Sequence, residues 1–180
     1  MPEAAERLFV ALDVDRLEQA EALLDRLAGI VGGCKIGSQL FTAAGPLAIE
    51  RALKRGYRVF LDLKYHDIPN TVAGAVREAT RLGVFMLNVH GSGGGAMMRA
   101  AVEAATKAAK EFALPRPLVL GVTVLTSLDR RGLEREVGVL GRCRRTCCGW
   151  RSARGRPGWT AAWPQRGRSR RCVLRWDNAG

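Results

Sequence analysis

A regular alternation of apolar, strand-like runs with segments of helical periodicity over the first 140 residues most constrains the fold of this chain. The strand-like runs cover residues 8–14, 32–37, 57–64, 84–90 and 117–125. Helical periodicity fills the intervals at residues 17–27, 41–54, 71–82 and 96–112. Repeats of this length are typical of βα units around a parallel sheet, whose strands are apolar because both of their faces are buried. The pattern predicts an α/β fold of about five βα units, either a doubly wound sheet or a partial (β/α) barrel.

Polar residues at the C-terminal ends of these runs favour the barrel. The first run ends in Asp13, the second carries Lys35 near its end, the fourth ends in His90, and the fifth leads into Thr126. The C-terminal ends of barrel strands meet at one mouth, where the active site is built. Each residue also has an ordinary structural interpretation when it is taken singly. Asp13 fits a turn or helix cap, Lys35 a solvated strand end, and His90 a hydrogen-bonded structural histidine.

The third run, VFLDLKYHDIPNT at residues 59–71, places three charges at the end of an apolar strand. Side chains of a strand alternate between its faces, so Asp62 and Lys64 are expected on one face, with Asp67 following in the next connection. Charges on the inward face of a buried strand must be paired or functional. These three residues are therefore the candidate chemical centre, and a purely structural ion pair is the alternative.

A glycine-rich segment offers a different interpretation. Gly91, Gly93 and Ala96 match the pattern G-x-G-x-x-G/A of a dinucleotide-binding turn between a strand and a helix. The acidic residue about twenty positions further on is Glu111, which falls at the end of a helix rather than of a second strand. We therefore expect only a glycine-rich turn with room for a close ligand.

The last forty residues have a different composition from the rest. Residues 1–140 hold 18 Lys and Arg against 16 Asp and Glu, whereas residues 141–180 hold 11 Arg, no Lys and a single acid, Asp177. The second stretch also contains all four Trp and four of the five Cys. A net charge of +12 suggests a nucleic-acid partner, but this charge belongs almost entirely to the tail. The cysteines match no recognised zinc spacing. The expected division is a barrel segment at 1–140 and an irregular, disordered tail at 141–180.

A shifted reading frame explains the tail better than nucleic-acid or zinc binding does. If its codons are read from their third base, Trp159-Thr160 must encode Asp and Trp163-Pro164 must encode Ala. With GC-rich codons the shifted tail reads as a helix, a strand and a second helix. We therefore predict a frameshift near residues 139–142.

No apolar run reaches 18 residues, so a transmembrane helix is not expected. The first fifteen residues are acidic and contain no hydrophobic signal segment. We expect a cytoplasmic protein without a membrane partner.

Five motifs together resemble a known family. FVALDV, CKIGSQLFTAAGP, VFLDLKYHDIPNT, VHGSGG and VTVLTSLD, in this order and spacing, resemble bacterial orotidine 5′-phosphate decarboxylase over residues 7–140. The resemblance implies a homodimeric (β/α)8 TIM barrel that converts orotidine 5′-monophosphate to UMP and CO2 in de novo pyrimidine biosynthesis. It implies no metal, no organic cofactor and no nucleic-acid partner.

The resemblance also implies roles for individual residues. Lys64 resembles the catalytic lysine, and Asp62 resembles the carboxylate that faces the substrate carboxylate. Asp67 resembles the aspartate that one subunit lends to the site of its partner. Asp13 and Lys35 resemble the residues that hold the ribose hydroxyls, and Lys35 also extends the charge array. The implied substrate-binding set is completed by Ile68, Thr71, His90 and Thr126, the last as the pyrimidine-binding hydroxyl.

The charges suit this chemistry. In the reaction that the resemblance implies, loss of CO2 leaves negative charge on a ring carbon, with no cofactor to absorb it. A fixed ammonium beside that carbon stabilises the charge and can then donate a proton. Carboxylates beside the ammonium in turn stabilise its positive charge.

Two alternatives remain open. The core pattern D-x-K-x-x-D is shared with sister enzymes that act on sugar phosphates, although HDIPNT and LTS are more specific to the orotidylate enzyme. The barrel of this family also needs three more strands and a late loop whose glycine and arginine bind phosphate, and residues 141–180 supply neither. An inactive, frameshifted fragment is therefore the other alternative.

Overall fold

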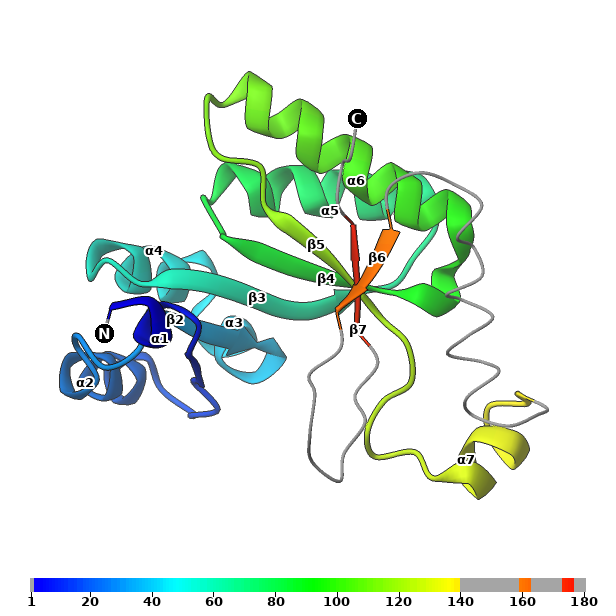
Figure 1. Ribbon diagram of the computed structural model, residues 1–180, viewed down its shortest axis with the longest axis horizontal. Helices are drawn as coiled ribbons and strands as arrows, with labels where there is room; N and C mark the ends of the chain where they lie inside the picture. The colour runs from blue at the N-terminus through cyan, green and yellow to red at the C-terminus, as the bar shows by residue number, and fades with distance from the viewer. Residues whose placement is uncertain (1, 140–158, 163–172, 177–180) are drawn as a thin grey trace.

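Five parallel strands in chain order form the centre of the computed structural model, which describes residues 2–139, 159–162 and 173–176 (Figure 1). Neighbouring strands pair in parallel along the chain, from β1 to β5. A doubly wound sheet would reverse its strand order at a switch point, so the sequential order identifies the winding of a (β/α) barrel. The prediction of an incomplete barrel with about five βα units is confirmed. The strands are β1 (Phe9–Ala11), β2 (Gly33–Gly37), β3 (Arg58–Tyr65), β4 (Met86–His90) and β5 (Leu118–Val122).

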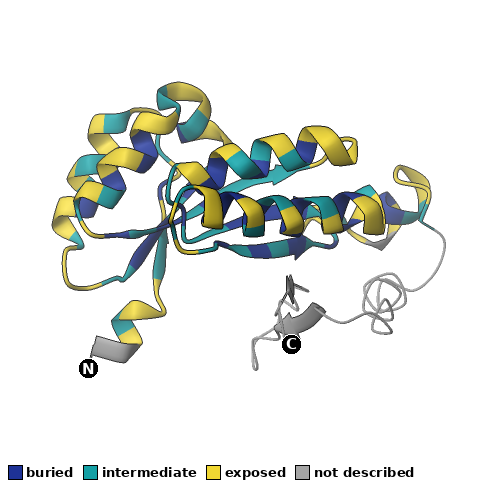
Figure 2. Ribbon diagram, turned by 90° about the horizontal axis from the view of Figure 1, so that it is seen from above, coloured by how far each residue is buried: buried dark blue, intermediate teal, exposed yellow. Residues whose placement is uncertain are grey.

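The main helices cover one face of this sheet (Figure 2). They are α2 (Leu17–Arg26), α3 (Ser38–Ala44), α4 (Pro46–Lys54), α5 (Pro69–Arg81) and α6 (Gly94–Glu111). Three short helices were not predicted: α1 (Pro2–Glu6), the 3₁₀ turn η1 (Gly91–Gly93) and α7 (Arg130–Arg135). The single helix predicted at 41–54 is also wrong, because the chain breaks it at Gly45 and starts α4 with Pro46.

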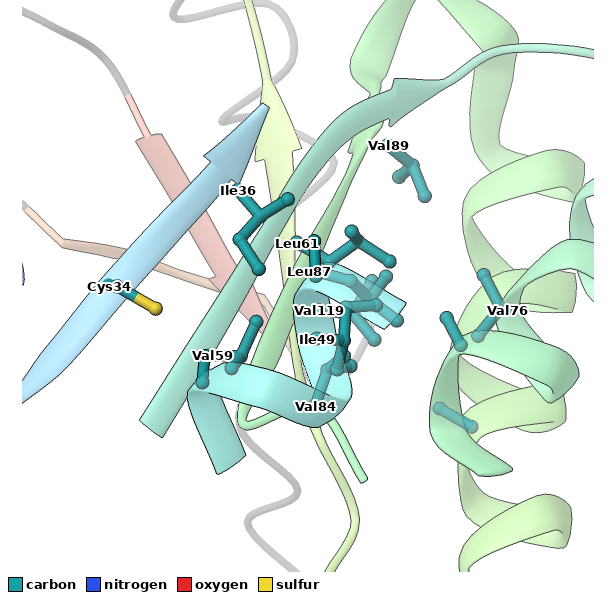
Figure 3. Close-up of a cluster of buried hydrophobic side chains, with 14 of the residues drawn as sticks. Cys34, Ile36, Ile49, Val59, Leu61, Val76, Val84, Leu87, Val89 and Val119 are labelled. Carbon is teal, nitrogen blue, oxygen red and sulfur yellow. The ribbon is translucent and has the colours of Figure 1, made fainter. Parts of the chain in front are cut away.

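The buried core lies between the sheet and these helices (Figure 3). Side chains of β3 show how the two faces of the sheet differ. Val59 and Leu61 face the helices and are fully buried, whereas Phe60 and Asp62 face the other way and are only partly buried. The prediction that both faces of the strands are buried is therefore wrong for this face. The reason is that five strands do not close a barrel around it.

Only two short parts of the predicted tail belong to the described residues. Trp159–Ala162 (β6) and Val173–Trp176 (β7) pair in antiparallel fashion, and β7 pairs with β5. These strands were not predicted. The rest of the tail lies outside the described residues, and its disorder stays a prediction. In the part of the chain that the structure describes, no helix is long and apolar enough to cross a membrane.

Candidate active site

A row of alternating charges crosses the C-terminal ends of the first three strands. The Lys35 ammonium on β2 lies 3.3 Å from a carboxylate oxygen of Asp13, which follows β1. The same ammonium lies 3.2 Å from Oδ2 of Asp62 on β3. The Lys64 ammonium lies 2.7 Å from the other oxygen of Asp62. The structure thus places a carboxylate between two ammonium groups, as the positions of these residues at the strand ends predicted.

Asp62 is the most enclosed member of the row. Its side chain is 12% exposed, against 25% for Lys35 and 36% for Lys64. Burial acts to raise the pKa of the Asp62 carboxyl, but hydrogen bonds from the Lys64 ammonium and the Asn88 amide outweigh it. The pKa therefore lies below the usual value for an aspartate, and Asp62 is ionised at neutral pH. Asp13 is 67% exposed and pairs with Lys35, so the alternative of a simple helix cap does not describe it.

The strand that carries Asp62 and Lys64 is irregular where they lie. β3 pairs with β4 at Leu61 opposite Leu87 and again at Tyr65 opposite Val89, with a register shift between the two pairs. Lys64 has a φ of 53°, in the left-handed region that few residues other than glycine adopt. The predicted proximity of the two charges is present, and it lies at a bulge rather than along a regular strand.

Asn88 is a site residue that the sequence analysis missed. It lies in the middle of β4 and is 3% exposed. Its amide nitrogen donates to Oδ1 of Asp62 at 2.6 Å, and its amide oxygen accepts from the backbone N–H of Lys64 at 2.8 Å. The sequence could have pointed to this residue, because an asparagine inside the apolar run MLNVH needs hydrogen-bond partners when it is buried.

The other charge of the third motif lies apart from the row. Asp67 is exposed in the connection between β3 and α5, and its carboxylate accepts from the backbone N–H of Ile68 at 2.6 Å. Ile68 is 66% exposed, a large value for an isoleucine. Thr71, in the first turn of α5, is also exposed. Together with His66, this connection lines an open depression of about 530 Å³.

His90 ends β4 as predicted and is partly buried. Its ring centroid lies 5.3 Å from that of His66. Burial lowers the pKa of His90, and the neighbouring His66 and Lys64 add smaller effects in the same direction. The imidazole is therefore neutral at neutral pH and offers one donor and one acceptor.

The glycine-rich turn does not have the surroundings of a dinucleotide-binding turn. A β-carbon on Gly93 would overlap the sulfur of Met97 and lie 3.1 Å from a carbon of the His66 ring. Side chains of the chain itself thus fill the position of a β-carbon on Gly93, but Ser92 and Gly93 also line the open depression beside His66 and Asp67, so the turn does border open space. The sequential strand order also lacks the switch point at which dinucleotides bind.

Thr126 lies farther from its strand than predicted. β5 ends at Val122, whereas the predicted run continued to residue 125. Thr126 is exposed in the turn that follows. Among the residues that the structure describes, no group of three or more His, Cys, Asp or Glu side chains could hold a metal ion.

Comparison with known proteins places this geometry in a family. The model of the Orotidine 5'-phosphate decarboxylase / HUMPS family matches residues 6–146. The chain belongs to this family. Curated relatives named orotidine 5'-phosphate decarboxylase include that of Moorella thermoacetica, which is 54% identical over 136 residues. That of Syntrophomonas wolfei is also 54% identical, over 139 residues.

Solved structures of orotidine 5′-phosphate decarboxylases share the fold. That of Lactobacillus acidophilus has a TM-score of 0.72 at 32% identity, with 81% of this chain and 65% of that chain covered. The Methanocaldococcus jannaschii enzyme, complexed with the inhibitor BMP, has a TM-score of 0.53 at 26% identity, with 66% and 52% covered.

The chain spans about half the length of the curated relatives that it matches. The Moorella match covers 76% of this chain and 54% of the relative, and the Syntrophomonas match covers 77% and 58%. The charged row lies inside the region matched by the family model.

Proposed function

We propose that this chain carries the chemical centre of an orotidine 5′-phosphate decarboxylase, which converts orotidine 5′-monophosphate to UMP and CO2. The observation that carries the proposal is the enclosed Asp62 carboxylate between the Lys35 and Lys64 ammonium groups, 3.2 Å and 2.7 Å away. This arrangement can stabilise negative charge on a substrate and deliver a proton to it. The name of the curated relatives and the inhibitor complex of the Methanocaldococcus enzyme support the choice of a nucleotide substrate.

In the proposed reaction, the bond between the ring carbon and the carboxylate carbon breaks and its electron pair stays on the ring carbon. The Lys64 ammonium stabilises this charge and then donates a proton to the same carbon. Asp62 faces the substrate carboxylate and fixes the position of the Lys64 ammonium. Asp13 and Lys35 bind the ribose hydroxyls, and His90 and Thr126 belong to the substrate-binding set. No metal or organic cofactor takes part.

A second copy of the chain is the proposed partner. Asp67, Ile68 and Thr71 are exposed on one connection, and an isoleucine that is 66% exposed suits an interface better than a solvated loop. In the proposed dimer, Asp67 reaches the site of the other subunit and completes the array of Lys35, Asp62 and Lys64. The proposal places the protein in the cytoplasm and assigns it no nucleic-acid or membrane partner.

An assay of orotidine 5′-monophosphate decarboxylation tests the proposal. The purified 180-residue chain is expected to release CO2, and Lys64→Ala to abolish this activity, since the lysine is the proton donor. Turnover of sugar-phosphate substrates instead would favour the sister decarboxylases. If neither substrate is turned over by the chain or by its frame-corrected version, the proposal is wrong.

Mixing two inactive variants tests the shared site. In a mixed dimer of Lys64→Ala and Asp67→Ala subunits, one site carries both substitutions and the other carries neither. Random exchange of subunits is therefore expected to restore about a quarter of the activity. If Asp67 acts within its own subunit, the mixture stays inactive.

A further inference from the structure

The bulge in β3 leaves a gap in the sheet beside the charged row. Between the pairs Leu61–Leu87 and Tyr65–Val89, the three residues 62–64 of β3 face the single residue Asn88 of β4. On its other side, Asn88 is in regular register with Leu120 of β5. The distortion is thus confined to β3, and Asn88 lies on the regular strand β4, opposite the bulge.

The Asn88 side chain occupies this gap and contacts two different groups of the bulge. Its amide oxygen accepts from the N–H of Lys64 at 2.8 Å, a backbone donor that the shifted register takes out of the regular ladder. Its amide nitrogen donates to Oδ1 of Asp62 at 2.6 Å. The oxygen that receives this hydrogen bond also contacts the Lys64 ammonium at 2.7 Å.

One amide therefore links the backbone of the lysine to the carboxylate that binds its ammonium. Asparagine suits this position because its donor and acceptor point in a fixed relation and carry no net charge. A leucine of similar size would leave the Lys64 N–H without an acceptor, and Oδ1 of Asp62 would lose one of its hydrogen-bond donors in an enclosed site. An aspartate would keep the acceptor but lose the donor.

We propose that Asn88 is a positioning residue that holds the bulge of β3, and with it Asp62 and the Lys64 ammonium, in the geometry of the proposed decarboxylation. The link to catalysis rests on the proposed function. The positional role itself can be measured without turnover, so failure of the two proposals can be told apart.

Two substitutions separate the two hydrogen bonds of the amide. Asn88→Leu removes both, and Asn88→Asp removes only the donor. Thr80→Val is a matched control, because Thr80 is also fully buried and its hydroxyl donates to the carbonyl of Val76 inside α5. The control removes a buried hydrogen bond of the helix layer without touching the bulge.

Nuclear magnetic resonance on the full chain provides two readouts. The first is the titration midpoint of the Asp62 carboxyl, followed by its carbon-13 signal and assigned with Asp62→Asn. The second is the hydrogen-exchange protection of the Lys64 amide. Asn88→Leu is expected to raise the midpoint by about one pH unit and to remove the protection. Thr80→Val is expected to leave both readouts unchanged.

The Asn88→Asp variant gives a pH-dependent signature of the contact between residue 88 and the Asp62 carboxylate. The introduced carboxyl and that of Asp62 would form a coupled pair that shares one proton over part of the acid range. In that range the protonated carboxyl can donate as the amide does, so the Lys64 amide stays protected. At higher pH both carboxyls are ionised and repel each other, and the hydrogen-exchange protection of the Lys64 amide falls.

Two results would overturn the proposal. One is that Asn88→Leu unfolds more easily than the parent chain but keeps its Asp62 midpoint and Lys64 protection. The other, which decides the question if Asn88→Leu does not fold, is that Asn88→Asp titrates at Asp62 like the parent chain. Loss of decarboxylation alone would bear only on the proposed function.

Discussion

Lys64 combines a charged side chain with a backbone conformation that suits glycine. At a φ of 53° the β-carbon of an ordinary residue is crowded by the neighbouring carbonyl oxygen, which costs about 1–2 kcal/mol. Such strain persists where the surrounding structure holds it, and it concentrates at functional sites. Here Asn88 bonds the Lys64 N–H, and Asp62 bonds its ammonium. In this conformation the Lys64 ammonium lies 2.7 Å from the Asp62 carboxylate.

A pair of substitutions at this position measures the strain. Lys64→Gly is expected to be more stable to urea unfolding than Lys64→Ala by about 1 kcal/mol, because only the alanine keeps a β-carbon at positive φ. Lys35 provides the control, since it lies in the regular part of β2. There the order reverses, and Lys35→Ala is more stable than Lys35→Gly by about 0.5–1 kcal/mol. Equal stability of the two Lys64 variants would contradict the strain.

Sequence predicted the meeting of Asp13, Lys35, Asp62 and Lys64 because parallel strands bring their C-terminal ends to one edge. It did not predict the bulge, since a register shift depends on how β3 fits β4 and leaves no mark in the alternation of side chains. Asn88 could have been found from its place in a buried apolar run. Thr126 was placed too close to its strand because the apolar run continues beyond the last paired residue, Val122.

At the scale of elements, the main strands and helices follow the predicted βα pattern, and the predicted helix at residues 41–54 is the one that the chain divides. Gly45 ends α3 and begins α4 with a φ of 59° and a ψ of −150°, a combination that is essentially restricted to glycine. Pro46 then occupies the first turn of α4, where its missing N–H costs nothing. The sequence carried this signal as Gly-Pro, but apolar periodicity across 41–54 obscured it.

Two glycine substitutions test the junction. Gly45→Ala is expected to destabilise the chain by about 1–3 kcal/mol, because alanine must leave this conformation or carry its strain. Gly74→Ala is the control, since Gly74 lies inside α5 with no atom within 4 Å of an added β-carbon. That change is expected to stabilise the chain by about 0.5–1 kcal/mol. Thermal and urea unfolding of both variants provide the measurement, and a neutral Gly45→Ala would contradict the restriction.

At the scale of the whole molecule, the row of charges at the strand ends is formed, although the sheet is not closed into a barrel. The face that carries Asp62 also carries Phe60, Met86 and Leu118, which are in register across β3, β4 and β5 and only partly buried. The other edge of β5 pairs with β7 in antiparallel fashion. A (β/α)8 barrel continues with parallel strands, so this pairing cannot extend it.

The coding DNA provides the decisive test at this scale. We predict that a single-base correction near residues 139–142 opens a longer frame with three more βα units. The composition supports this prediction, since residues 141–180 contain 11 Arg, no Lys and all four Trp, as a shifted GC-rich frame would encode. The half-buried apolar face supports it as well, because strands that close the barrel would cover Phe60, Met86 and Leu118. The corrected protein is expected to decarboxylate orotidine 5′-monophosphate faster than the 180-residue chain. The reason is that a loop late in the corrected sequence would bind the substrate phosphate through its glycine and arginine. A gene in which no such correction yields further βα units would rule the shift out, and the tail would then need an explanation of its own.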